Sequence, residues 1–177
     1  MAIRKASSYS QKKARPFTRN SRNKSKSYIK TVPQNKVVKY HIGSQKDYRE
    51  GKHKYAVRMI SEGRSQMRDN ALEAARQFLT KSLDEQALGQ YYLAVKVFPH
   101  HLLRENKTAA GAGADRMSSG MTHSYGIVIG RAAIVKPGQD VFFISCTTDK
   151  IARIARDSLA AVKAKMPCKM TIIFEKI

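Results

Sequence analysis

Basic side chains near the start of the chain carry the clearest chemistry in this sequence. Thirteen Lys and Arg residues precede the first acidic residue, Asp47. In an extended chain each of them can reach a phosphate, Arg through a bidentate contact and Lys as a point charge. Tyr9, Phe17 and Tyr28, which lie within residues 1–36, can stack on unpaired bases. The positions that we predict to contact nucleic-acid phosphates are Arg4, Lys5, Lys12, Lys13, Arg15, Arg19, Arg22, Lys24, Lys26 and Lys30.

Two adjacent histidines, His100 and His101, are the next candidates. Adjacent side chains do not converge on one ion unaided, and neither a Cys-x-x-Cys nor a His-Glu-x-x-His motif accompanies them. A metal site is therefore disfavoured. We expect an exposed pair at the entrance of a loop, where the rings can stack on bases or hydrogen-bond to phosphates if RNA lies nearby.

The sequence gives no positive indication of an enzyme. Residues 111–115 are glycine-rich, but a dinucleotide-binding fingerprint needs a preceding strand, a following helix and a third glycine at fixed spacing. Cys146 and Cys168 have no identifiable base partner, which favours reduced structural cysteines over a nucleophile. The acidic residues are scattered singly except at Asp84-Glu85. We expect no catalytic residue, no cofactor and no metal.

The elements that must position these residues alternate between strand and helix patterns. Helical periodicity covers residues 67–83, where one stripe consists of Ala71, Leu72, Ala75, Phe78, Leu79 and Leu83. It also covers the segment from the capping cluster 147–149 to Pro167, with Lys150, Arg153, Arg156 and Lys163 facing outward. The residues predicted to face inward in that segment are Ile151, Ile154, Ala155, Leu159, Val162 and Met166. A turn at 136–140 is expected to join two strands as a hairpin. The predicted strands are 37–42, 55–60, 91–98, 124–135, 141–146 and 169–175.

This pattern predicts a single α+β domain, a mixed and mostly antiparallel sheet packed with two helices, together with a basic N-terminal extension and a long internal loop. The domain spans residues 37–177, and its loop, 99–122, follows neither period. A loop of this length in a compact domain is usually functional or disordered. The extension, residues 1–36, has too little apolar surface to fold alone.

Charge separates the extension from the domain. The chain has 177 residues, 34 basic and 13 acidic, and a net charge of +21. Because 13 basic residues precede Asp47, the part before it carries +13 and the rest +8. Self-repulsion of this size opposes compaction unless a polyanion relieves it, and nucleic acid is the commonest such partner. A solubilising tail is the alternative, which a long stretch without any acid disfavours.

Other classes of protein are disfavoured by length and composition. No apolar run approaches the roughly 18–20 residues that cross a bilayer, and no signal peptide begins the chain. The extension resembles a mitochondrial transit peptide in its Arg, its Ser and its lack of acids, but prolines and the absence of leucine argue against one. Two cysteines fit a reducing compartment. We therefore expect no membrane partner and no small-molecule substrate.

Three stretches carry a family resemblance. The run 111–121, Gly-Ala-Gly-Ala-Asp-Arg-Met-Ser-Ser-Gly-Met, resembles the signature loop of a universal large-subunit ribosomal protein family. Its archaeal and eukaryotic member is the tenth large-subunit protein, and its bacterial counterpart is the sixteenth. Residues 71–76, Ala-Leu-Glu-Ala-Ala-Arg, are similar to the family's first helix, and residues 100–107 to its strand-to-loop junction. The resemblance covers residues 28–177.

This resemblance implies a sandwich-like α+β fold bound to large-subunit rRNA in the cytoplasmic ribosome, beside neighbouring ribosomal proteins. The expected position is near the A-site side of the peptidyl-transferase centre, where the ten basic positions of the extension would bind rRNA. Loop 99–122 would point toward A-site and P-site tRNA, and the chemistry would belong to RNA. The runner-up function is a free-standing RNA-binding or RNA-chaperone module. The loop residues implied to face rRNA or tRNA are His100, His101, Arg104, Lys107 and Arg116.

Overall fold

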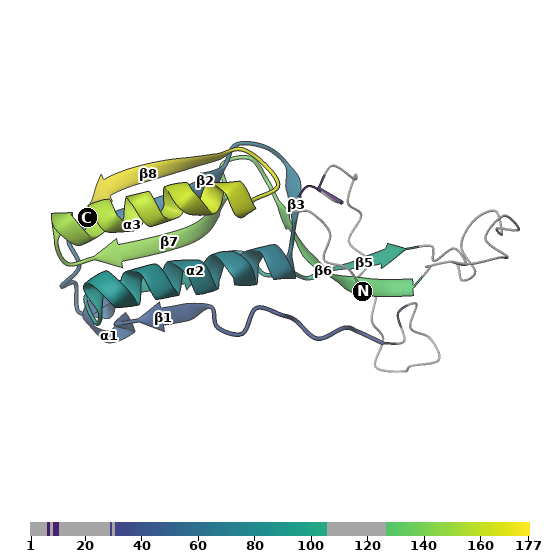
Figure 1. The fold of residues 1–177 in the computed structure, drawn as a ribbon, viewed down its shortest axis with the longest axis horizontal. Helices are drawn as coiled ribbons and strands as arrows, with labels where there is room; N and C mark the ends of the chain where they lie inside the picture. The colour runs from purple at the N-terminus through teal and green to yellow at the C-terminus, as the bar shows by residue number, and fades with distance from the viewer. Residues whose placement is uncertain (1–6, 8, 11–28, 30, 106–126) are drawn as a thin grey trace, which may run out of the picture.

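The α+β fold predicted from the sequence is confirmed. The computed structural model describes residues 7, 9, 10, 29, 31–105 and 127–177 (Figure 1). The helices in these ranges are α1 (Gln45–Arg49), α2 (Asp69–Ala87) and α3 (Asp149–Val162), with a 3-10 turn at Lys163–Lys165. The strands are β1 (His41–Gly43), β2 (Tyr55–Ser61), β3 (Ser65–Arg68), β4 (Tyr91–Val95), β5 (His101–Glu105), β6 (Ile127–Val135), β7 (Asp140–Cys146) and β8 (Met170–Lys176).

The described strands form two sheets. One has five strands in the order β1-β4-β7-β2-β8, and the other has three in the order β3-β6-β5. Every recorded pairing is antiparallel. Helices α2 and α3 lie side by side on one face of the larger sheet (Figure 1). The single sheet expected from the sequence is thus divided in two, with the smaller sheet at the end of the molecule opposite the C-terminus.

The predicted hairpin between residues 124–135 and 141–146 is wrong. The turn exists, with Gly138 at a φ of +76° and its N–H donating to the Ser61 carbonyl at 2.8 Å. The strands on either side of it, β6 and β7, belong to different sheets. β7 lies between β4 and β2, while β6 lies between β3 and β5. The turn therefore carries the chain from one sheet to the other.

Other boundaries differ because of pairing that the local sequence does not encode. Met67, expected at the start of a helix, lies in β3 opposite Ala133 of β6. The first strand covers 41–43 instead of 37–42, and the segment before it is bound to side chains of α2. The strand expected over 91–98 ends at Val95. Part of the region expected to be a loop, 99–122, is β5, which pairs with β6.

The core lies between the larger sheet and the two helices. Val57, Leu93 and Ile144 are adjacent across β2, β4 and β7 and are fully buried. The predicted inward stripe of α3 is buried or packed against this core, and its basic residues are exposed as expected. Phe78 of α2, predicted to face inward, is instead 39% exposed, with Lys165 Nζ lying 5.7 Å from its ring centroid. Burial of a continuous apolar layer is the main stabilising contribution to this half of the fold.

The segment 31–40 docks along α2 through two acidic side chains (Figure 1). Glu73 accepts the backbone N–H of Val38 at 3.3 Å, and Asp69 accepts that of Lys36 at 3.4 Å. Asp69 and Glu73 are one helical turn apart, so they share a face of α2. Hydrogen bonds from Arg76 first, and also from Gln77, lower the pKa of Glu73. The ionised carboxylate makes these bonds charge-assisted and therefore stronger than neutral ones.

We predict that Glu73→Gln loosens this segment. The substitution removes the charge from bonds to Arg76 and to the Val38 N–H, which lowers the free energy of unfolding by about 1–3 kcal/mol. Urea denaturation measures that loss, and amide hydrogen exchange at Val38 should become faster. The control is Glu85→Gln on the same helix, whose side chain is 60% exposed and pairs with Lys81 at 3.9 Å. Such a surface pair contributes little. Unchanged exchange at Val38 in Glu73→Gln would contradict the prediction.

Candidate nucleic-acid interface

The β5–β6 pair holds both ends of the segment 106–126 at one place. His101 is opposite Ala132, and Glu105 is opposite Ile127, so the ladder continues to the last described residue on each strand. The register shifts between Leu103 and Arg104, as at a β-bulge, which increases local twist. Strand β6 is also paired with β3 along its other edge. The smaller sheet is therefore a base from which this segment begins and ends.

The predicted loop residues differ in their exposure to solvent. His100 is exposed, and its Nδ1 lies 3.3 Å from the Phe98 carbonyl oxygen. His101, the first residue of β5, is only 7% exposed. Burial lowers the pKa of His101, and the nearby His100 and Arg104 lower it further, so its imidazole is neutral at neutral pH. Arg104 is half-buried on the same strand. Lys107 and Arg116 lie outside the described residues.

The N-terminal extension reaches the same sheet. Gln66 of β3 donates through Nε2 to the Tyr9 carbonyl at 3.0 Å and through its backbone N–H to the Ser10 carbonyl at 3.2 Å. Arg131 of β6 donates through Nε to the Pro33 carbonyl at 2.7 Å. All ten basic positions predicted to bind phosphate lie outside the described residues. What the structure provides is the attachment of the extension to β3 and β6.

The outer face of α3 is a second basic surface. Lys150, Arg153, Arg156 and Lys163 are exposed there. Arg153 pairs with Asp149 one turn away, at 2.9 Å, while the helix's other side packs on the core. A Lys and Arg face of this kind can contact phosphates, but it is also the usual composition of a solvated helix face. The stronger structural indication is therefore the sheet that carries the two long polar segments.

The cysteines have the features of structural residues. Cys146 is fully buried in β7, and burial raises the pKa of its thiol to about 12, so it is protonated and unreactive at neutral pH. Cys168 is half-buried before β8. Both are free thiols. Within the ranges that the structure describes, no group of three or more His, Cys, Asp or Glu side chains is arranged to hold a metal ion, and no helix is long and apolar enough to cross a membrane.

Three residues that position this interface were missed by sequence reasoning. Arg131 is a charged residue inside the otherwise apolar run of β6, which is a signal that its side chain has a specific partner. Asp69 and Glu73 are acids at four-residue spacing on the inward side of an amphipathic helix, a second signal of the same kind. Their partners are backbone groups of residues 33–38, which no side-chain pattern identifies.

Comparison with known proteins agrees with the resemblance seen in the sequence. Residues 12–173 match the family model described as ribosomal protein L16p/L10e. A protein of Staphylothermus marinus named large ribosomal subunit protein uL16 is 36% identical over 178 residues, covering 100% of this chain and 96% of that protein. Proteins of the same name from Methanococcus aeolicus and Pyrobaculum calidifontis are 38% and 35% identical, each covering 99% of this chain and 96% and 95% of their own lengths. The chain belongs to the ribosomal protein L16p/L10e family.

Proposed function

We propose that this protein is a structural constituent of the large ribosomal subunit that binds large-subunit rRNA near the A-site and peptidyl-transferase region and helps to position tRNA. The observation that carries the proposal is the three-stranded sheet, because it anchors both the basic extension and the segment 106–126. A charged extension suits binding to folded RNA, whose phosphates attract it at any sequence. In this proposal the protein supplies no catalytic group, and the chemistry of peptide-bond formation belongs to RNA.

The extension supplies the electrostatic part of rRNA binding. Its ten basic positions carry a charge of +10, whereas residues 47–177 together have a net charge of +8. Because Arg131 and Glu73 bind the stretch 33–38, the extension is attached to the domain at a fixed point. The positions of the contacts that the extension makes are therefore fixed relative to the loop. Neighbouring ribosomal proteins and the cytoplasmic ribosome complete the proposed setting, which the names of the archaeal relatives support.

The loop supplies the tRNA-facing part. Residues 99–122 contain the exposed His100 and, in their undescribed portion, Lys107 and Arg116, which we propose to face rRNA or tRNA phosphates. Buried, neutral His101 presents little surface in the isolated protein, so its role in this proposal is to hold the start of β5. Arg104 follows the register shift in β5 and is the remaining member of the set that we propose to face rRNA or tRNA. The positive charges are few, so shape and position matter more here than net charge.

Removal of residues 1–28 tests the extension, because it leaves the docked segment 31–40 in place. We expect weaker binding to large-subunit rRNA and a shallower dependence of log affinity on log salt concentration. Each lost phosphate contact should reduce that slope by about 0.7–0.9. Filter binding across a salt series measures both quantities. A slope equal to that of the full chain would mean that the extension is a solubilising tail.

Substitution of Lys107→Gln together with Arg116→Gln tests the loop. We expect large subunits carrying this double variant to assemble normally but to bind A-site tRNA and form peptide bonds more slowly. The control is Lys150→Gln with Arg153→Gln, which removes the same charge from the exposed face of α3. Sedimentation measures assembly, and tRNA binding with single-turnover peptide transfer measures function. Equal impairment by the two double variants would contradict a specific role for the loop.

A further inference from the structure

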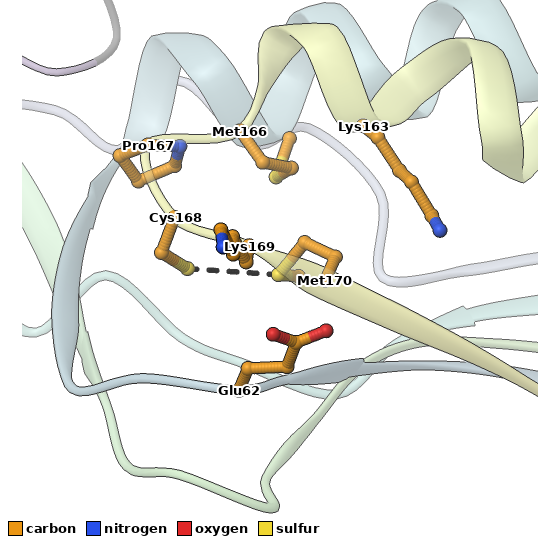
Figure 2. A pocket seen from close by; sticks show the side chains of 7 residues that line it. All are labelled: Glu62, Lys163, Met166, Pro167, Cys168, Lys169 and Met170. Atoms are coloured by element: carbon orange, nitrogen blue, oxygen red, sulfur yellow. Dashed lines mark hydrogen bonds between the residues drawn. The ribbon is translucent and has the colours of Figure 1, made fainter.

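Three sulfur-bearing side chains line one surface pocket at the turn before β8. Met166, Cys168 and Met170 come from a stretch of five residues, and Figure 2 shows all three around the same hollow, with Glu62 across from them. Met166 and Met170 are only 7% and 4% exposed, whereas Cys168 is half-buried. The proposed ribosomal function uses none of its sulfur atoms.

The local backbone explains why these sulfurs meet. The 3-10 turn Lys163–Lys165 ends just before Pro167, which cannot continue a helix because it lacks an N–H. The chain then extends into β8, which begins at Met170. Residues two apart in an extended chain point to the same side. Accordingly, the Cys168 thiol donates to Met170 Sδ at an Sγ–Sδ distance of 3.6 Å (Figure 2).

Two buried hydroxyl groups hold the cysteine sulfur from the other side. Ser65 Oγ donates to Cys168 Sγ at 3.2 Å, and Ser61 Oγ lies 3.3 Å from the same atom. Ser61 and Ser65 are 1% and 5% exposed, so their positions are fixed by packing in β2 and β3. Ser61 Oγ also donates to the Gly63 carbonyl at 2.7 Å, so Ser65 is the hydroxyl donor to the sulfur. These contacts hold Cys168 Sγ in one place beside the Met170 thioether.

A thiolate and thioethers are soft ligands, which select Cu(I) among the biological metals. With metal–sulfur bonds of about 2.3 Å, two sulfurs at the observed spacing subtend roughly 100° at a shared ion, close to tetrahedral geometry. A zinc site would use Cys, His or carboxylate ligands, and the described part of the chain gathers no group of three of these. The preference for Cu(I) comes from these soft donors, because Glu62, Lys163 and Lys169 place charges of both signs around the same pocket.

We propose that Cys168, Met170 and Met166 bind one soft monovalent cation, Cu(I) or its analogue Ag(I). Binding replaces the S–H bond of Cys168 with a sulfur–metal bond and releases the thiol proton to solvent, without electron transfer. Met170 supplies the second sulfur from the pair that is already in contact, and Met166 supplies the third from the wall of the pocket. The site does not depend on the proposed ribosomal function.

Titration of the purified, reduced, RNA-free full chain with silver nitrate in chloride-free buffer tests the site. We expect one tightly bound equivalent, which protects Cys168 from iodoacetamide in peptide-resolved mass spectrometry. Met170→Leu preserves apolar volume and should lower silver affinity by about 10–100-fold or more. Met166→Leu should weaken binding in the same direction, and Cys168→Ser should abolish the tight site.

Matched controls separate this cluster from other sulfur atoms. Met67→Leu changes a fully buried methionine of β3 that does not line the pocket, and Cys146→Ala removes the buried thiol of β7. Both should keep one tight equivalent. If Met166→Leu and Met170→Leu, with circular dichroism unchanged, bind silver as tightly as the parent chain, an isolated thiol is sufficient and the proposal is overturned. A tight equivalent that persists in folded Cys168→Ser overturns it as well.

Discussion

Hydrogen bonding along both edges of β6 is the constraint on which the functional half of this protein depends. One edge pairs with β3 and the other with β5, so β6 can neither shift nor twist independently of its neighbours. The same strand carries Arg131, which binds the Pro33 carbonyl. Because a one-residue slip would turn every side chain to the opposite face, the register of β6 determines where Arg131 points and where the segment 106–126 begins and ends.

The acidic residues reveal how a chain of charge +21 forms a compact domain. Asp69 and Glu73 bind backbone N–H groups of the incoming segment, and Glu175 and Asp140 pair with Arg58 on the larger sheet. Burial raises the pKa of Asp69, whereas its hydrogen bonds to the Lys36 and Asn70 N–H groups oppose that shift. These four acids are thus engaged in holding the chain together. Its exposed basic side chains remain available to a polyanion, which relieves the repulsion that they cause.

Local patterns predicted the elements whose stability is local, and failed where pairing is distant. The stripe of α3 follows a 3.6-residue period within one stretch of chain, so it was predicted correctly down to Leu159 and Val162. Strand β3 was missed, because Ser65 to Arg68 become a strand only through β6, more than sixty residues away. The turn at Gly138 carries the same signals whether or not the adjoining strands pair. The contacts of the extension and of Lys107 and Arg116 stay predictions.

Anchoring both polar segments on one small sheet changes how they bind a shared partner. Closing a loop between adjacent ends costs conformational entropy that grows only slowly with its length, and here the β5–β6 ladder bears that cost within the fold. The extension starts from a fixed point as well, because α2 and β6 hold residues 33–38. In the proposed function, binding of one segment would therefore raise the effective concentration of the other near the same partner. Under that proposal, modest contacts in the loop would act at a defined site, while the charge of the extension would supply most of the affinity.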